Sequence, residues 1–527
     1  MKMRGYTNNP VEISFAGTIR EDSADVEMDV IFVGPSGEFP VPAFRAGGNA
    51  FRVRFSSPNP GRYTYRTICS SDVGLDGLAG ELEIEPYDGE NDLYRHGPLR
   101  VAANRRTLEH SDGTPFFWLG DTWWMGLTKR LDWPHGFASL AADRVAKGFN
   151  LIQIVAGPLP DFDAEDATWH PQQANEGGWP WEQGWARINP EFYDLADRRI
   201  QYLVDHGLVP CIVAMWGFYL PFMGIERVKQ HWRNLVARYG AYPVVWCLCG
   251  EIELPTYSHL ANTDALEAEK AAQIAGWTEV ARYVRALDPY RRILTVHPAW
   301  AQSGRDAIAD ESLIDLDLLQ TSHGGHAILG RTMDRVNASN ARTPRMPVVN
   351  GEPCYEGIMG TAWQEMQRFV FWTSVMSGSA GHTYGAQGIW AMSSRDEPFV
   401  GSTMNWGEGF WQDVMHYPGS AQVGLGRRFL ERYPWWLFEP RPDQLAIGIP
   451  GKLKIFYLAG QWVDPKFAGV RDKRIEIEPD IQYRAYFFDP RTGADVAVGP
   501  VEPDADGTWP VPRKPTMDDW VLVLDGT

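Results

Sequence analysis

The chain has 527 residues, with 67 acidic against 49 basic side chains and a net charge of −18. At about 150 residues per domain this length predicts two or three domains, and a hydrophobic content of 44% excludes a disordered chain. The acidic balance argues against a nucleic-acid partner, which needs a basic face, and against binding to an anionic membrane surface.

The ends and the cysteines indicate where the protein works. The N-terminal segment lacks an apolar run of signal-peptide length, and no stretch is apolar enough to span a membrane. The cysteine count is odd, without the spacing of a disulfide framework, and no histidine completes a zinc spacing. We therefore expect reduced, buried thiols in a cytoplasmic protein without a structural metal; oligomeric state is left open. The cysteines are Cys69, Cys211, Cys247, Cys249 and Cys354.

Residues 1–96 read as short strands separated by turns. Apolar side chains alternate at Phe51, Val53 and Phe55, and Pro, Gly and Asn cluster at 35–37 and 57–61. This spacing predicts an N-terminal β-sandwich. Of the 23 tryptophans none lies in residues 1–100, 20 lie in 101–440 and three in 441–527, so the composition itself divides the chain.

Residues 97–440 alternate strand-like apolar runs with helical patterns. In the helical stretch 189–207, Asn189 suits the N-cap, Pro190 the first turn and Gly207 the stop. Eight such units predict a (β/α)8 barrel. An open doubly wound sheet is the rival, but no Gly-rich dinucleotide motif follows the first strand. The predicted strands span 115–121, 149–157, 208–217, 243–251, 292–298, 314–323, 346–352 and 380–386.

Residues 441–527 return to short strands, such as those in KLKIFYLAG, YRAYFFDPRTG and WVLVLDG. They predict a second, C-terminal β-sandwich. The predicted fold is therefore a TIM barrel flanked by a β-sandwich on each side.

Three carboxylates end predicted barrel strands: Asp121 on the first, Glu251 on the fourth and Glu352 on the seventh. Active sites of such barrels lie at the C-terminal ends of the strands. Strands four and seven face each other across the mouth, and glycoside hydrolysis needs two carboxyl groups flanking one bond. We therefore predict Glu251 and Glu352 as the catalytic pair, and Asp121 as a ligand of a substrate hydroxyl.

Strand alternation gives a testable side-chain orientation. If Glu352 points into the barrel, Asn350 and Val348 share that inner face. Two nearby acids, Glu253 and Glu356, compete for the catalytic roles if a β-bulge shifts the alternation. For any single acid, a helix cap or a solvated loop charge is the alternative.

Five segments carry a resemblance to a known family. They are FFWLGDTWW (116–124), NPEFYDLADRRIQYLVDHGL (189–208), VVWCLCGEIE (244–253), PVVNGEPCYEG (347–357) and GHTYGAQGIW (381–390). They resemble glycoside hydrolase family 140, the apiosidase-type barrels, and more broadly the retaining glycosidase barrels. The front resembles the immunoglobulin-like module that often precedes these barrels, and the tail resembles their small C-terminal sandwich.

The resemblance implies roles and shows two departures. It implies that Glu251 is the acid/base and Glu352 the nucleophile. The family pattern usually has Gly-Gly-Asp at the first site, where this chain has Cys249-Gly250-Glu251, and the wider group usually has Asn where Gly250 stands. The longer Glu places the leaving group differently, and the usual contact of Asn with the sugar 2-hydroxyl is missing.

Further side chains near strand ends are candidates for the sugar pocket, with core packing as the alternative for each. Aromatic faces stack on sugar rings, and long loops at 158–187 and 385–415 are predicted to narrow the mouth. The candidates besides Asp121 are Trp123, Trp124, Gln153, Trp181, Trp216, His297, His323, His382, Tyr384 and Trp390.

The predicted function is cleavage of a small glycoside or oligosaccharide by a retaining double displacement, without metal or cofactor. Two alternatives stay open: an inverting glycosidase on the same barrel, and an inactive carbohydrate-binding protein. A barrel aldolase or isomerase would need a Schiff-base lysine or a metal set, and neither stands at the strand ends.

Overall fold

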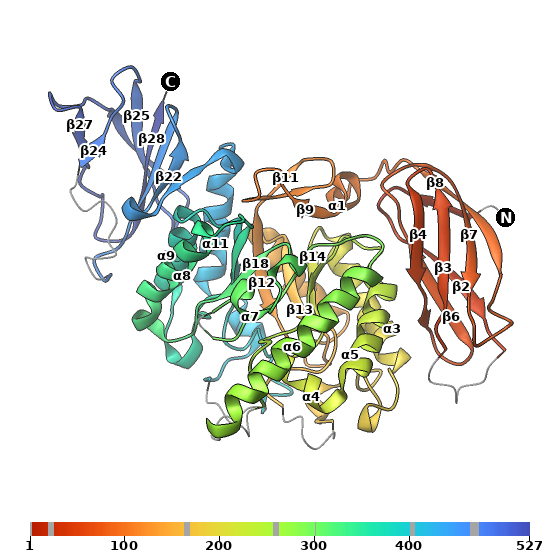
Figure 1. Ribbon diagram of the computed structural model, residues 1–527. Coiled ribbons are helices and arrows are strands. Elements are labelled where there is room, and N and C mark those ends of the chain that lie inside the picture. Colours follow the sequence, from red (N-terminus) through yellow and green to blue (C-terminus); the bar gives the residue numbers. More distant parts are fainter. Residues whose placement is uncertain are drawn as a thin grey trace.

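The computed structural model describes residues 3–18, 26–162, 169–256, 263–300, 302–400, 406–463 and 474–526. A central body of mixed strands and helices carries one β-sandwich on each side, the N-terminal one red to orange and the C-terminal one blue in Figure 1. The predicted fold class, a barrel between two sandwiches, is confirmed.

The N-terminal sandwich closes over a core of alternating strand residues that includes Phe51, Val53 and Phe55. Its two sheets face each other, as the alternation requires. The larger sheet has the order β1 (Met3–Tyr6), β8 (Ala79–Glu85), β7 (Gly61–Ile68), β3 (Asp29–Gly34) and β4 (Gly37–Pro42), and the smaller β2 (Val11–Ala16), β6 (Ala50–Phe55) and β5 (Phe44–Arg45).

A short helix, α1 (Asp92–His96), and a small sheet of β9 (Leu99–Val101), β10 (Leu108–His110) and β11 (Pro115–Phe116) lead into the barrel. Eight parallel strands then overlap the eight predicted segments. They are β12 (Trp118–Trp123), β13 (Leu151–Val155), β14 (Val209–Val213), β15 (Val245–Cys247), β16 (Leu294–Thr295), β18 (Asp317–Gln320), β19 (Val348–Glu352) and β20 (Gly381–Tyr384).

Strands β12 to β16 pair in sequence order, as do β18 to β20, and β20 returns to pair with β12. Between β16 and β18, the Asp315 amide donates to the Leu294 carbonyl at 2.8 Å and the Thr295 hydroxyl to the Leu316 carbonyl at 2.7 Å. A two-residue antiparallel strand, β17 (Gln302–Ser303), is added to β18. These bonds join the fifth and sixth strands and close the barrel.

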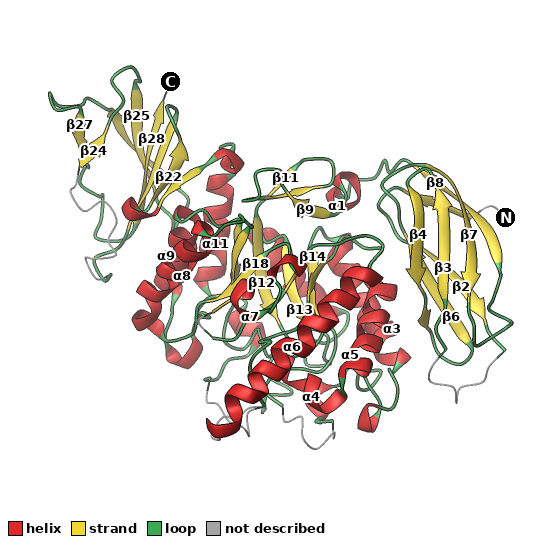
Figure 2. Ribbon diagram, viewed as in Figure 1, coloured by secondary structure: helices red, strands yellow, loops and turns green. Residues whose placement is uncertain are grey.

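Helices cover the outside of the barrel (Figure 2). In α3 the Asn189 side chain caps the first turn and Pro190 is the first helical residue, as predicted. The fifth unit differs from the prediction: in the described part of the stretch between the fifth and sixth strands, the one α-helix is the four-residue α7 (Gly304–Ala307), followed by a 3-10 turn at Glu311–Leu313. The other helices of the layer are α2 (His135–Lys147), α3 (Pro190–Asp205), α5 (Ile225–Tyr239), α6 (Thr263–Leu287), α8 (Leu329–Ala341), α9 (Gln364–Met376) and α11 (Pro418–Leu430).

The C-terminal sandwich packs on α9 through its strands β22 and β23. Its larger sheet has the order β21 (Glu439–Arg441), β22 (Ala446–Ile449), β23 (Leu453–Leu458), β28 (Trp520–Gly526), β25 (Tyr483–Phe488) and β26 (Asp495–Pro500), and β24 (Arg474–Glu476) pairs with β27 (Thr508–Pro510). All five cysteines of the chain are free and buried. Across the described residues, the helices are too short or too polar to cross a membrane.

Candidate active site

Glu251 and Glu352 meet at the mouth of the barrel through the side chain of Gln320. Its amide nitrogen donates to Glu251 Oε1 and to Glu352 Oε1, at 2.9 Å each. Twice 2.9 Å, or 5.8 Å, is therefore the largest separation these two oxygens can have. A primary amide has two N–H groups, so Gln320 can serve both carboxyl groups at once.

Two histidines surround the carboxyl group of Glu352. His323 Nε2 lies 2.8 Å from Oε1, and His297 Nε2 lies 3.0 Å from Oε2. Burial alone would raise the pKa of Glu352, but its contacts with His297 and His323 outweigh burial and hold that pKa well below the usual range. Glu352 is therefore ionised at neutral pH.

Glu251 has the opposite electrostatic environment. Its Oε2 accepts a hydrogen bond from the indole of Trp216 at 3.0 Å. Burial, followed by the negative charge of Glu352, raises the pKa of Glu251 to about 7. The two carboxyl groups are thus set apart, one ionised and the other able to hold a proton at neutral pH.

Packing against Trp216 explains why position 250 is a glycine rather than an asparagine. A Cβ on Gly250 would lie 2.2 Å from the ring of Trp216, so the indole fills the space that an Asn would take. Glu251 itself has φ +41°, in the left-handed region that non-glycine residues rarely adopt. Gly250 and Trp216 therefore act as a pair in placing the Glu251 carboxyl group.

A pocket of about 460 Å³ opens above the two glutamates. This volume suits a small ligand, and most of the wall is aromatic or aliphatic. Of the predicted residues, Trp124, Trp216, His323 and Trp390 line it together with the glutamates. His297 lies buried directly behind Glu352. The lining also includes Trp300, Gln320, Tyr355, Met359 and Trp406, which are not among the predicted pocket residues.

Parts of both predicted mouth loops, residues 163–168 and 401–405, lie outside the described residues. The parts that are described contribute Pro160, Asp161, Trp390 and Trp406 to the pocket wall.

Asp121 and Trp123 do not reach this pocket. Strand β12 runs two residues past its predicted end, so Asp121 lies within the strand and points at the helix layer. There it accepts from Arg144 Nε of α2 at 2.5 Å and from the Trp123 indole at 2.7 Å. Trp123 packs edge-on against Phe137 of α2. We therefore reassign both residues from sugar binding to the attachment of α2.

This reassignment predicts an effect on stability. Asp121→Ala should lower the free energy of unfolding by about 3–5 kcal/mol, because it removes the fully buried carboxylate that pairs with Nε of the fully buried Arg144 guanidinium. Asp143→Ala removes the other, partly exposed partner of Arg144 and should cost less. Urea unfolding measures both. A normal stability of Asp121→Ala combined with a raised KM would restore Asp121 to the sugar site.

His382 and Tyr384 on β20 also face away from the pocket. His382 packs edge-on against Phe371 of α9, and Tyr384 donates to Glu356 Oε2 at 2.6 Å. The inward residue is Thr383, which donates to Gln153 Oε1 at 2.8 Å. Gln153 thus lies inside the barrel but outside the pocket lining, and none of the three predicted residues contacts the pocket.

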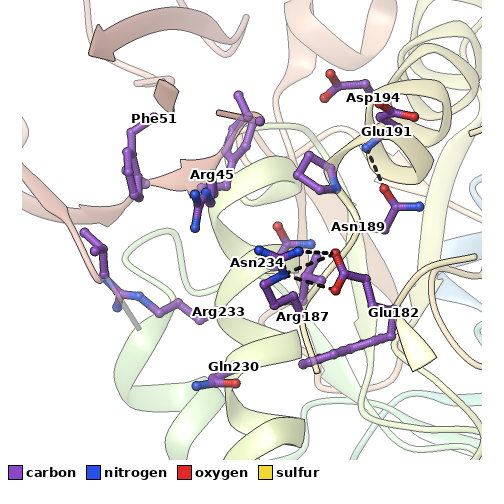
Figure 3. A pocket seen from close by; sticks show the side chains of 18 of the residues that line it. Arg45, Phe51, Glu182, Arg187, Asn189, Glu191, Asp194, Gln230, Arg233 and Asn234 are labelled. Carbon is purple, nitrogen blue, oxygen red and sulfur yellow. Dashed lines mark hydrogen bonds and ion pairs between the residues drawn. The ribbon is translucent and has the colours of Figure 1, made fainter. Parts of the chain in front are cut away.

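Trp181 belongs to a different hollow, of about 670 Å³, between the N-terminal sandwich and the helix layer (Figure 3). Its indole donates to His231 Nδ1 of α5 at 3.1 Å. Glu182 and Arg187 form an ion pair at 2.9 Å in the same hollow. Trp181 therefore packs the loop that follows β13 against α5 on the outside of the barrel.

Strand β19 was predicted to point Val348, Asn350 and Glu352 into the barrel, but Val348 does not share the inward direction of Glu352. The register between β18 and β19 shifts by one residue, so that Leu319 pairs with Asn350 and Gln320 with Glu352. Val348 packs with Leu319 and with Val336 of α8, on the helix side. A β-bulge at Gly351 therefore turns Glu352 inward while Val348 faces out, which corrects the predicted shared face.

Among the described residues, no cluster of His, Cys, Asp or Glu is arranged to hold a metal ion. The site that the fold does assemble is a pair of glutamates of unequal proton affinity, at the C-terminal ends of opposite barrel strands, under an aromatic pocket. This is the architecture of a glycoside hydrolase.

Comparison with known proteins leads to the same class of enzyme. Residues 102–437 match the family described as "Apiosidase-like, catalytic domain", and residues 7–70 match a domain of unknown function, DUF5060. The first match spans more than half of the chain, so the chain belongs to the apiosidase-like family and is a glycoside hydrolase. Comparison with curated proteins finds no match.

Solved structures share the fold. A protein from Bacteroides vulgatus ATCC 8482 superposes with a TM-score of 0.75 at 16% identity, over 100% of both chains. A glycoside hydrolase family 5 protein from the same organism gives 0.63 at 19% identity, over 82% of this chain and 93% of that one. A third structure, named glycoside hydrolase, gives 0.62 at 20% identity, over 82% and 97%.

Proposed function

We propose that this enzyme cleaves a small glycoside or oligosaccharide with retention of configuration, with Glu352 as nucleophile and Glu251 as acid/base. The observation that carries the proposal is the amide of Gln320, 2.9 Å from an oxygen of each glutamate. Retaining pairs are about 5–5.5 Å apart and inverting pairs about 6.5–9.5 Å. Gln320 keeps Glu251 Oε1 and Glu352 Oε1 within 5.8 Å of each other, which is shorter than the inverting range and supports retention.

In the first step an oxygen of Glu352 attacks the anomeric carbon while the glycosidic C–O bond breaks. Glu251 gives its proton to the leaving oxygen, and the aglycone departs as an alcohol. Gln320 and His323 hold the attacking carboxylate in place by hydrogen bonds. The product is a glycosyl ester on Glu352.

In the second step Glu251, now a carboxylate, takes a proton from water. The water oxygen attacks the anomeric carbon, the ester C–O bond breaks, and Glu352 is released as a carboxylate. The Trp216 indole and the Gln320 amide both donate to Glu251, and they stabilise its ionised form between the two steps.

The test uses aryl glycosides of several pentoses and hexoses, in pyranose and furanose form. For the sugar that is cleaved, NMR should show the product first in the configuration of the substrate. The 2-deoxy-2-fluoro analogue with a dinitrophenyl leaving group should label the chain, and mass spectrometry should place the label on Glu352. An inverted product without label would favour the inverting alternative.

The proposed roles also predict the pH dependence. Glu251 must be protonated to act, so kcat/KM should fall about tenfold per pH unit above its pKa of about 7. Glu352 stays ionised well into the acid range, so the rate should hold as the pH falls below 7. Initial rates on an aryl glycoside between pH 4 and 9 measure this. A rate that rises through pH 7 would reverse the two roles.

We also propose a cytoplasmic location, supported by five cysteines that are all free and buried.

A further inference from the structure

The pocket wall beside Glu251 is apolar and open. Leu254 follows the glutamate by one turn, and its amide donates to the Glu251 carbonyl at 2.9 Å. The Ile252 amide donates to the His297 carbonyl at 3.1 Å, which brings the segment that carries Trp300 alongside. The Trp300 side chain is 64% exposed, with its N–H on Ser322 Oγ at 3.2 Å. This hydrogen bond fixes a large apolar ring at the mouth, in contact with water.

The same pocket has several acids, and His323, which lies 2.8 Å from Glu352 Oε1, is the one basic side chain among the described residues that line it. Among the described residues that line it, the acids are Asp161, Glu251 and Glu352, and no Lys or Arg is present. The nearby segments outside the described residues, 163–168, 257–262, 301 and 401–405, contain no Lys or Arg and one histidine, His259. An anionic group in this pocket would meet no Lys or Arg among these residues, His323 is already bonded to Glu352, and the carboxylates would repel the added charge.

The chemistry of retention decides which part of the substrate meets which wall. The nucleophile attacks from the face opposite the leaving group, and the acid stands beside the leaving oxygen. Tyr355 and His323, whose rings are 4.5 Å apart, flank Glu352. On the other side, Leu254 follows Glu251 by three residues, and Trp300 follows His297, whose carbonyl accepts from the Ile252 amide next to Glu251; both side chains line the pocket. The sugar therefore lies toward Glu352, and the departing group lies against Leu254 and Trp300.

We propose that the leaving-group subsite takes an uncharged, apolar alcohol of aryl or alkyl type and rejects a sugar acid. This inference rests on the proposed function, because it takes Glu251 as the acid. An apolar leaving group would cover the exposed faces of Trp300 and Leu254, and each buried apolar group favours binding.

The experiment compares leaving alcohols of similar acidity, so that the difficulty of breaking the bond is matched. The probes are methyl, butyl, benzyl and 3-carboxypropyl glycosides of the sugar that the aryl glycoside panel identifies. The benzyl glycoside should exceed the methyl glycoside in kcat/KM by at least about tenfold. The carboxypropyl glycoside should fall below the butyl glycoside by at least about tenfold.

Two variants test whether Leu254 and Trp300 cause the preference for the benzyl over the methyl glycoside. Trp300→Ala and Leu254→Ala should each lower the ratio of benzyl to methyl kcat/KM by about fivefold or more. Trp436→Ala is the matched control, because Trp436 is 38% exposed and lies outside the pocket. Its ratio should stay that of the parent enzyme.

The outcomes separate this inference from the proposed function. Cleavage with labelling of Glu352, but with benzyl and methyl rates within twofold or with equal butyl and carboxypropyl rates, would overturn only the leaving-group assignment. Unchanged ratios in both Trp300→Ala and Leu254→Ala would do the same. An enzyme that cleaves none of the aryl glycosides and takes no label would instead overturn the proposed function.

Discussion

Glu352→Gln is expected to lower kcat by at least about four orders of magnitude, because an amide oxygen is a poor nucleophile and cannot form the glycosyl ester. The variant should fold normally. Gln has the shape of Glu, and its amide oxygen can still accept from Gln320 and His323, which now lie 2.9 and 2.8 Å from Glu352 Oε1. Steady-state rates on an aryl glycoside and thermal unfolding measure the two properties.

The matched control is Glu356→Gln, four residues further along the chain. Glu356 is buried and accepts from Tyr384 and from the Gly419 amide at 3.1 Å, outside the pocket lining. Its substitution should change kcat by less than about tenfold. Near-normal turnover by Glu352→Gln, or a collapse of turnover confined to Glu356→Gln, would end the assignment of Glu352.

The strand order and the positions of the two glutamates could be predicted from the sequence, whereas the facing of several side chains could not. Apolar runs between capped helices, such as the one at Asn189 and Pro190, mark the strands. The barrel strands, however, are buried on both faces: every residue of β12, β13 and β19 is buried. A strand buried on both sides carries no alternation from which to read an inner face.

Because the sequence does not reveal which face of these strands points inward, the predicted directions of Asp121 and Val348 were wrong. The orientation of Asp121 depends on where β12 ends, and that of Val348 on a bulge at Gly351. Both features depend on the neighbouring strand and have no local sequence pattern. Gln320 was missed for a different reason, since a neutral amide gives no charge signal. Its place at the end of the sixth strand, three residues before His323, was the clue available.

Glu251→Ala should reveal the acid/base role through its dependence on the leaving group. With an alkyl glycoside, which needs protonation, kcat/KM should fall by about three orders of magnitude. With a dinitrophenyl glycoside the first step needs no acid, so the glycosyl ester on Glu352 should accumulate. Added azide should then attack that ester, restore turnover and yield a glycosyl azide in the configuration of the substrate.

The structure gives the reason why azide fits the space left by Glu251. Removal of the carboxylate exposes two donors, the Gln320 amide and the Trp216 indole, which lie 2.9 and 3.0 Å from its oxygens. Both can hold an anion, whereas the intact carboxylate would repel it. Glu253→Ala is the control, because Glu253 accepts from the Ala299 amide outside the pocket lining and should show no response to azide. A glycosyl azide of inverted configuration, or the absence of rescue with an inverted sugar product, would assign the enzyme to the inverting mechanism.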